Sequence, residues 1–183
     1  MRLVKLPENL LQLSADLAAD FDEITRVTRT IRMKLQEKAD GKLLKGDEIT
    51  GWLGEVYGKM LLNGRLVSDE YDYDIVAQDM RISIKARKGT SSGWNISSLI
   101  PKVEGENCPT HLMFIQFTDS YSLFRVWLFP WKELYGNRRF MEKKVRGEHR
   151  GYYVRIKPAK DRDYLIYWDD PYWRMERRGG NPG

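Results

Sequence analysis

The sequence predicts an α+β fold class in which N-terminal helices are followed by a central mixed β-sheet. Apolar residues recur at helical spacing in the first third of the chain, and the spacing then changes to the alternation typical of strands. The later strands follow one another with little helix between them. Because 183 residues are enough for one domain with a substantial core, we expect a single domain over residues 1–175. Its helical part covers about residues 7–40, and residues 176–183 form a disordered tail.

The composition is that of an ordinary globular protein, with 42% hydrophobic and 31% charged residues. No stretch approaches the roughly 18 apolar residues that a membrane span requires, and the N-terminus lacks the apolar core and cleavage site of a secretion signal. The single cysteine, Cys108, can form neither an internal disulfide nor a thiolate zinc site, which fits a reducing compartment. We therefore expect a cytoplasmic protein that does not contact membranes.

Two helices are expected to open the chain. Pro7 suits a first helical position and is followed by a segment rich in leucine and alanine. The second helix covers residues 21–38, and Asp40-Gly41 marks its end. Its apolar residues recur at helical spacing, at Ile24, Val27, Ile31 and Leu35.

A third helix is marked more clearly, between a capping Asp47 and a terminating Asn63-Gly64. Seven residues form one broad apolar stripe on it: Ile49, Trp52, Leu53, Val56, Tyr57, Met60 and Leu61. Three glycines are expected on the other side, at positions 51, 54 and 58. Because glycine destabilises a helix, they indicate a packing or functional requirement.

The remaining segments read as strands. A β-hairpin is expected with strands near residues 71–77 and 81–88 and a turn at Gln78-Asp79. A second pair of strands, residues 111–117 and 122–129, turns at Asp119-Ser120 and is followed by a short helix at residues 131–135. Weaker alternation indicates two further strands, at residues 152–156 and 164–168.

The hairpin places chemically active side chains on one face. If the turn has two residues, Ala77 pairs with Met80, so that Asp74 lies opposite Ser83 and Asp72 lies opposite Lys85, each pair about 5 Å apart. A turn of three residues would break this register. Carboxylate oxygens suit Mg²⁺, which polarises a phosphate and activates water, and an ammonium group can hold that water or stabilise charge on the phosphate. The alternative reading is a cross-strand ion pair on a solvated face.

Three ordered pieces of the chain, GEVYGKML, YDYDIV and RISIKAR, resemble the PD-(D/E)xK, or restriction-endonuclease-like, nuclease superfamily. The later segments HLMFIQF and YSLFRVWLFP resemble the strands that usually complete the family's sheet, and the resemblance covers about residues 47–134. It implies that Glu55 is the acid of the helix, Asp74 the metal ligand and Lys85 the catalytic lysine. It also implies hydrolysis of DNA, duplex DNA first, with Mg²⁺ as cofactor and Mn²⁺ as a possible substitute.

The chain departs from the family pattern at two positions. Tyr73 precedes Asp74 where the family often has proline, and Ser83 stands where the second acid is expected. Some enzymes of the family have Ser-x-Lys and recruit a glutamate from elsewhere, so Ser83 stays among the candidate catalytic residues. Asp72, Glu55 or Glu104 is expected to supply the missing acid. If none does, the protein is a non-catalytic nucleic-acid-binding relative on the same fold.

Two assignments keep an alternative. Glu55 and Lys59 are four residues apart in the favourable order, which also predicts an ion pair on the helix surface. Asp72 competes with Asp74 as a metal ligand; we prefer Asp74 because the apolar pair Ile75-Val76 follows it into the strand.

The charge distribution favours a nucleic-acid partner. The net charge is +5 with a pI of about 9.2, and basic residues greatly outnumber acidic ones between residues 132 and 162. Six side chains are the candidates for contacting phosphates: Arg87, Lys88, Arg138, Arg139, Lys143 and Lys144. A solvated basic face, or one that binds an acidic protein, is the alternative. An enzyme that cuts both strands is commonly a symmetric dimer, so we expect a homodimer formed through the N-terminal helices.

Overall fold

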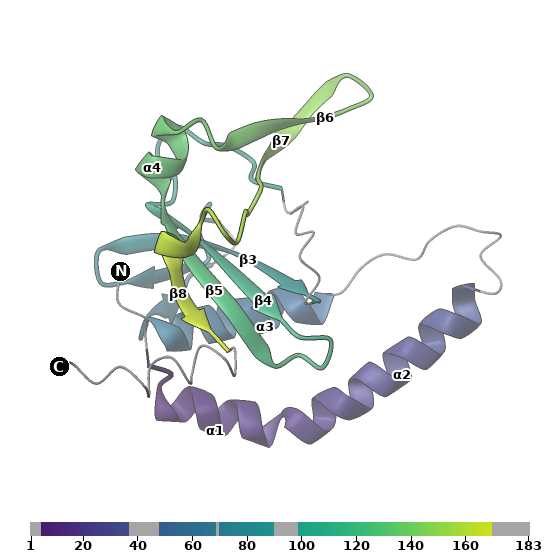
Figure 1. The fold of residues 1–183 in the computed structure, drawn as a ribbon. Coiled ribbons are helices and arrows are strands. Elements are labelled where there is room, and N and C mark those ends of the chain that lie inside the picture. The colour runs from purple at the N-terminus through teal and green to yellow at the C-terminus, as the bar shows by residue number, and fades with distance from the viewer. Residues whose placement is uncertain (1–4, 37–47, 69, 90–98, 170–183) are drawn as a thin grey trace.

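The computed structural model describes residues 5–36, 48–68, 70–89 and 99–169. The described chain opens with α1 (Glu8–Asp16), α2 (Ala18–Gln36) and α3 (Glu48–Leu61). A six-stranded sheet follows in the order β1-β2-β3-β4-β5-β8, with β3 and β4 parallel and the other neighbours antiparallel. The prediction of an α+β fold with N-terminal helices before a central mixed sheet is therefore confirmed (Figure 1).

The strands of the sheet are β1 (Arg65–Leu66), β2 (Ile75–Ala77), β3 (Met80–Lys88), β4 (His111–Phe117), β5 (Leu123–Pro130) and β8 (Leu165–Trp168). A short helix, α4 (Trp131–Gly136), follows β5, and a 3-10 turn, η1 (Arg162–Tyr164), precedes β8. A separate two-stranded hairpin consists of β6 (Phe140–Val145) and β7 (Glu148–Val154) and extends away from the sheet (Figure 1). Strand β6 was not predicted, because its central residues are charged and hide the alternation.

Most expected elements are confirmed, although α2 begins at Ala18 and not at residue 21, and two strands also begin at other residues than predicted. Strand β7 begins earlier than predicted, at Glu148, and β2 begins only at Ile75, whereas a strand from Tyr71 was expected. The expected cap at Asp47, the helix end at Asp40-Gly41 and the tail at residues 176–183 lie outside the described residues. None of the described helices is long and apolar enough to cross a bilayer.

The sheet has an apolar layer on each face. On β4, Met113, Ile115 and Phe117 belong to the cluster under the N-terminal helices. Leu112 and Phe114 alternate with them and belong to a second cluster on the opposite face. Burial on both faces explains why the β4 sequence, HLMFIQF, reads as an almost continuous apolar run.

The prediction of which side of α3 packs on the sheet is wrong, as the positions of its glycines show. Gly54 and Gly58 are buried against the sheet, whereas the prediction placed them opposite the packing side, and Trp52 is 69% exposed. A Cβ atom on Gly54 would lie 2.4 Å from the Cβ of Ala86, and one on Gly58 would lie 2.5 Å from Cδ1 of Ile84. The helix thus approaches β3 so closely that no side chain fits at these positions, which is a packing reason for both glycines.

Helices α1 and α2 differ in how far they join the core. Leu10 of α1 is fully buried, and Phe21 near the start of α2 packs on Tyr121 with ring centroids 5.3 Å apart. The rest of α2 extends beyond the body of the domain (Figure 1). Within α2, Val27 is 40% exposed and Met33 is 60% exposed.

Candidate active site

The hairpin register is the one that a two-residue turn predicts. Ala77 pairs with Met80 and Ile75 pairs with Ile82, and the turn residue Gln78 adopts a positive φ of 55°. The first residue before the paired segment, Asp74, donates its backbone N–H to the carbonyl of Ile82 over 2.9 Å. The backbone therefore holds Asp74 against β3 at the point where the two strands separate.

The backbone of β2 stops pairing with β3 at Asp74, and the side-chain carboxylate of Asp74 makes the next hydrogen bond to β3 in its place. Its Oδ2 accepts the backbone N–H of Ile84 and lies 3.4 Å from the hydroxyl Oγ of Ser83, which donates to it. Without this contact, the backbone N–H of Ile84 would lie at the strand edge with no acceptor. The Asp74 side chain satisfies this donor at the point where the pairing of the strands ends. Within the described part of the chain, Oδ1 of Asp74 accepts no hydrogen bond. Among the described residues, one carboxylate oxygen is therefore held by hydrogen bonds and the other is not.

Lys85 belongs to the same face of β3 as Ser83, two residues further along. Ser83 is buried and Lys85 is half-buried. Their register partners on β4 are Leu112 and Phe114, which belong to the cluster on the face away from α3. Among the described residues, no carboxylate forms an ion pair with Lys85. The sequence prediction that brought Asp74, Ser83 and Lys85 to one place on the hairpin agrees with this geometry.

The expected pairing of Asp72 with Lys85 is wrong. Asp72 lies in a bend before β2, and its Oδ2 is 2.6 Å from Nζ of Lys102. This hydrogen bond raises the pKa of Lys102 above its usual value. Strand pairing extends only as far as Ile75, so the backbone at Asp72 is not held in a strand. The Asp72 side chain therefore pairs with Lys102, which comes from the segment after β3.

Glu55 comes from the helix on the other face of the sheet. Its neighbour Gly54 faces Ala86, and one residue along a helix corresponds to a rotation of about 100°, so Glu55 lies on the flank of α3, where it is half-buried. Beyond Ile82, none of the described strands pairs with β3 on the side of β2. Residues from the two faces of the sheet can approach each other only along that edge. Glu104, the other candidate acid, is exposed.

The acidic side chains of the candidate site offer few protein ligands for a magnesium ion. No three histidine, cysteine, aspartate or glutamate side chains converge to hold a metal within the described ranges. Of the described carboxylates, Asp74 is the one whose printed contacts hold it against β3, at Ser83 and Ile84, next to Lys85 in the strand. Mg²⁺ commonly takes one or two carboxylates and keeps several waters or substrate phosphates, so the donors present fit an ion held mainly by water and substrate.

The candidate phosphate contacts separate into two regions. Arg87 is exposed and lies on the same face of β3 as Lys85. Lys88 points to the other face, where its Nζ lies 3.9 Å from the centre of the Tyr121 ring. Lys143 and Lys144 belong to the projecting hairpin, and Lys144 pairs with Glu142 over 3.2 Å.

Arg139 has a structural role that the sequence did not indicate. Its guanidinium holds both oxygens of the buried Asp161, at 2.9 and 3.0 Å, and donates to the carbonyl of Arg155. Asp161 also accepts the backbone N–H of Lys157 over 2.7 Å. Arg139 therefore stabilises the chain before β8 and is removed from the set of phosphate contacts. Its neighbour Arg138 is exposed at the turn after α4.

Sequence reasoning named Arg87 as a candidate phosphate contact, but it missed the row of residues that continues from Arg87 across the sheet on the face of Lys85. Register partners connect Arg87 of β3 to Gln116 of β4, Gln116 to Arg125 of β5, and Arg125 to Trp168 of β8. Gln116 is buried and donates to the carbonyl of Gly89 over 2.6 Å. A signal was present, because an amide and an arginine interrupt otherwise apolar strands. Their adjacency, however, depends on the strand order.

No protein-family model matches the chain, and a search of curated proteins finds no match.

Proposed function

We propose that the protein is a magnesium-dependent nuclease that hydrolyses phosphodiester bonds of DNA, with duplex DNA as the first substrate. The observation that supports this most directly is the anchoring of the Asp74 carboxylate on β3, with Lys85 two residues beyond Ser83 on the same face. The order of the elements, with α3 before the hairpin, also agrees with the resemblance to the PD-(D/E)xK superfamily.

Each residue has a distinct proposed role. Oδ1 of Asp74 would bind the ion, while Ile84 and Ser83 hold the other oxygen and orient the carboxylate. Bound Mg²⁺ would polarise the phosphate and lower the pKa of an attacking water. Lys85 would position that water or stabilise the charge that develops on the phosphate. Glu55, from the flank of α3, would add a second carboxylate along the open edge of β3. Arg87 would contact the substrate backbone.

The cleavage experiment uses variants chosen from the contacts of each residue. Asp74→Asn keeps a carbonyl oxygen that can accept the Ile84 N–H, whereas alanine would leave this donor without a partner at a cost of about 1–3 kcal/mol. Lys85→Ala is compared with Lys59→Ala, which changes an exposed lysine of α3. Plasmid DNA is incubated with each purified protein and Mg²⁺ or Mn²⁺, and circular dichroism verifies folding.

Cleavage by the wild type and by Lys59→Ala, lost in Asp74→Asn and Lys85→Ala, would support the proposal. Cleavage that survives in folded Asp74→Asn and Lys85→Ala would refute this site. Because the donor set is small, metal binding should also be weak without substrate and tighter with DNA present. Calorimetric titration of Mn²⁺ into Lys85→Ala, with and without a short duplex, tests that coupling.

A second candidate is a non-catalytic nucleic-acid-binding protein on the same fold. Two observations favour it: Ser83 replaces the usual acid, and the described acids do not converge in a group of three. This candidate predicts salt-dependent DNA binding that Arg87→Ala weakens, with no metal-dependent cleavage by any variant.

The proposed setting is the cytoplasm, where the single thiol of Cys108 stays reduced, and the proposed assembly is a homodimer through α2. Helix α2, part of which extends beyond the body of the domain (Figure 1), exposes the apolar residues Val27 and Met33. Val27→Asp should convert the dimer to a folded monomer in light scattering, because a charge at a helix contact is unfavourable. A wild type that is monomeric at all concentrations would exclude this assembly.

A further inference from the structure

The projecting hairpin, residues 140–154, has an excess of positive charge. It holds four basic and two acidic side chains: Lys143, Lys144, Arg146, Arg150, Glu142 and Glu148. Both acids already have a basic partner within the hairpin, at 3.2 Å from Lys144 and at 2.7 Å from Arg150. Lys143 and Arg146 form no ion pair with any residue that the structure describes. Their two charges are therefore left for an anionic partner.

The far end of the hairpin is a narrow ribbon that extends into solvent (Figure 1). Its turn consists of Arg146 and Gly147, with φ angles of 53° and 85°, the positive values of a type I′ turn. A bulge in the pairing of β6 with β7 increases the twist of the ribbon. Residues 144–150 are all exposed, so the free part is about 10 Å long at about 3.3 Å per residue. Arg146 lies at its tip.

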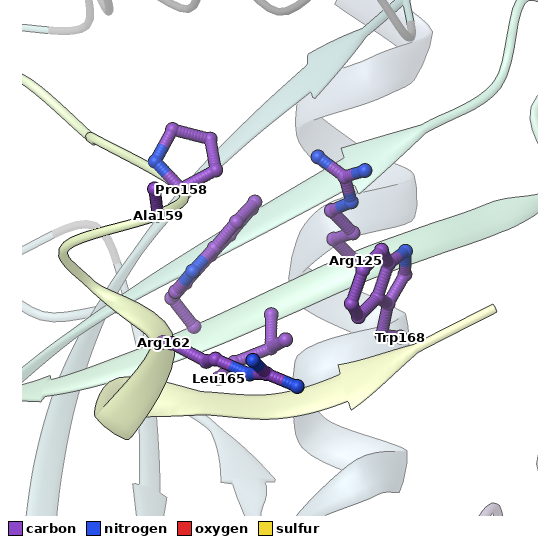
Figure 2. A pocket seen from close by; sticks show the side chains of 7 residues that line it. Arg125, Pro158, Ala159, Arg162, Leu165 and Trp168 are labelled. Atoms are coloured by element: carbon purple, nitrogen blue, oxygen red, sulfur yellow. The ribbon is translucent and has the colours of Figure 1, made fainter. Parts of the chain in front are cut away.

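The base of the hairpin is held to the domain at both ends. Val154 is buried in the second apolar cluster, and Phe140 packs on Trp131 with ring centroids 4.7 Å apart. Arg139, directly before β6, donates to the carbonyl of Arg155, directly after β7, over 2.9 Å. The chain then returns toward β8 along one wall of a cavity of about 300 Å³, which lies between β5, β8 and this segment (Figure 2). The tip is therefore carried on a fixed base, which lowers the entropy lost when it binds a partner.

Contacts along the surface connect the base of the hairpin with the candidate active site. Tyr152 of β7 exchanges backbone hydrogen bonds with Ile100, each over 2.8 Å. Lys102 follows two residues later and pairs with Asp72 over 2.6 Å, two residues before Asp74. The side chains of Lys102 and Asp72 are 42% and 29% exposed, so this connection does not pass under the second apolar cluster. The hairpin therefore projects from the segment that contacts the bend before Asp74.

We propose that the projecting hairpin enters the major groove of B-form DNA and so selects duplex DNA as the substrate of the candidate site. The major groove is about 12 Å wide and about 8.5 Å deep and admits a two-stranded ribbon, whereas the minor groove is only about 6 Å wide. Lys143 contacts a phosphate, and Arg146 at the tip reaches the edge of a guanine. The inference rests on the proposed function in one respect, since the duplex at the hairpin is taken to be the duplex cut at Asp74.

The first experiment compares nucleic acids by fluorescence anisotropy, with the full chain and without metal. We expect a short DNA duplex to bind at least about tenfold more tightly than an RNA duplex of the same sequence, because the major groove of A-form RNA is too deep and narrow for side chains to read. Single-stranded DNA has no groove and should be weaker by a similar factor. Equal affinity for the DNA duplex and either of the others would overturn the inference. Competition by polyglutamate as strong as that by duplex DNA would assign the hairpin to an acidic protein and would also overturn it.

The second experiment changes the two unpaired charges without disturbing the ribbon. Arg146→Asn leaves asparagine before glycine, a pair that favours the same turn, and should weaken duplex binding about tenfold or more. Lys143→Gln keeps the length of the side chain and should reduce the slope of log affinity against log salt by about 0.9, the value for one phosphate contact. Lys59→Gln and Arg65→Gln remove exposed charges from α3 and β1 and should change neither quantity. Hairpin variants that are folded by circular dichroism and behave as these controls do would refute the proposed contact.

A third experiment identifies the groove. A duplex with 7-deazaguanine lacks the N7 acceptor that guanine presents in the major groove. The wild type should bind it about tenfold more weakly than the unmodified duplex, whereas Arg146→Asn should bind both equally. Equal binding of both duplexes by the wild type would overturn the placement of the tip in the major groove.

These measurements need neither metal nor cleavage, so they separate the hairpin from the nuclease. A protein that binds duplex DNA through the hairpin but never cuts it refutes only the nuclease. Metal-dependent cleavage of duplex DNA by Arg146→Asn and Lys143→Gln with the KM of the wild type refutes only the role of the hairpin.

Discussion

Replacing Gly54 by alanine tests the close contact between α3 and the strand that carries Lys85. A Cβ atom at this position would lie 2.4 Å from the Cβ of Ala86, more than 1 Å closer than an ordinary carbon contact of about 3.5–4.0 Å. Ala86 is part of the sheet, so helix and strand must move apart to admit the methyl group. At Gly51, on the same helix, an added Cβ would meet nothing within 4 Å.

The two substitutions share one contribution to the free energy of unfolding and differ in a second contribution. Alanine in place of glycine stabilises a helix by about 0.8–1.0 kcal/mol, and this gain applies to both positions. Overpacking costs about 1–3 kcal/mol and applies only at Gly54. Gly51→Ala should therefore stabilise the protein by up to about 1 kcal/mol, and Gly54→Ala should be less stable than Gly51→Ala by about 1–3 kcal/mol. In a domain of this size, that difference corresponds to roughly 2–12 °C in Tm.

Urea unfolding followed by circular dichroism measures the difference directly. The double variant Gly54→Ala with Ala86→Gly removes the opposing methyl group, so it should recover stability beyond the sum of the single effects. If Gly54→Ala and Gly51→Ala are equally stable, the close contact between α3 and β3 is refuted. A double variant that shows no recovery would locate the cost away from Ala86.

Two further predictions concern single side chains. Arg139→Ala leaves the buried carboxylate of Asp161 without its bidentate partner and should lower the free energy of unfolding, measured with urea, by about 3–5 kcal/mol. As a control, Arg138→Ala changes an exposed neighbour and should alter the free energy of unfolding by no more than about 0.5 kcal/mol. Equal effects of the two substitutions would contradict the structural role of the Arg139–Asp161 pair. Burial lowers the pKa of His111 below its ordinary value, so protonation favours the unfolded chain and stability is lost as the pH falls below about 6.5. His111→Gln should lose less stability than the wild type between pH values of about 7.5 and 5.5, and an identical loss would exclude this contribution.

Local patterns in the sequence were sufficient for the order of most elements, though not for β1 and β6, and for the centre of the candidate site. A two-residue turn and the alternation of side chains determine the register over a few residues. They therefore predicted that Asp74 lies beside Ser83, with Lys85 on the same face. The polarity pattern of α3 predicted the helix itself, but it did not show which side faces the sheet, because a glycine adds no side chain to that pattern.

The tertiary structure decided the partners that are far apart in the sequence. Asp72 pairs with Lys102 because the ladder stops before it, and Arg139 is drawn to the buried Asp161 across more than twenty residues. The cavity around Trp168 combines two strands that become neighbours only through the order of the sheet. Turn geometry and side-chain alternation act over a few residues and can therefore be predicted from the sequence. The pairing of distant charges and the walls of a cavity depend on how whole elements pack, and that is determined by the sum of many contacts.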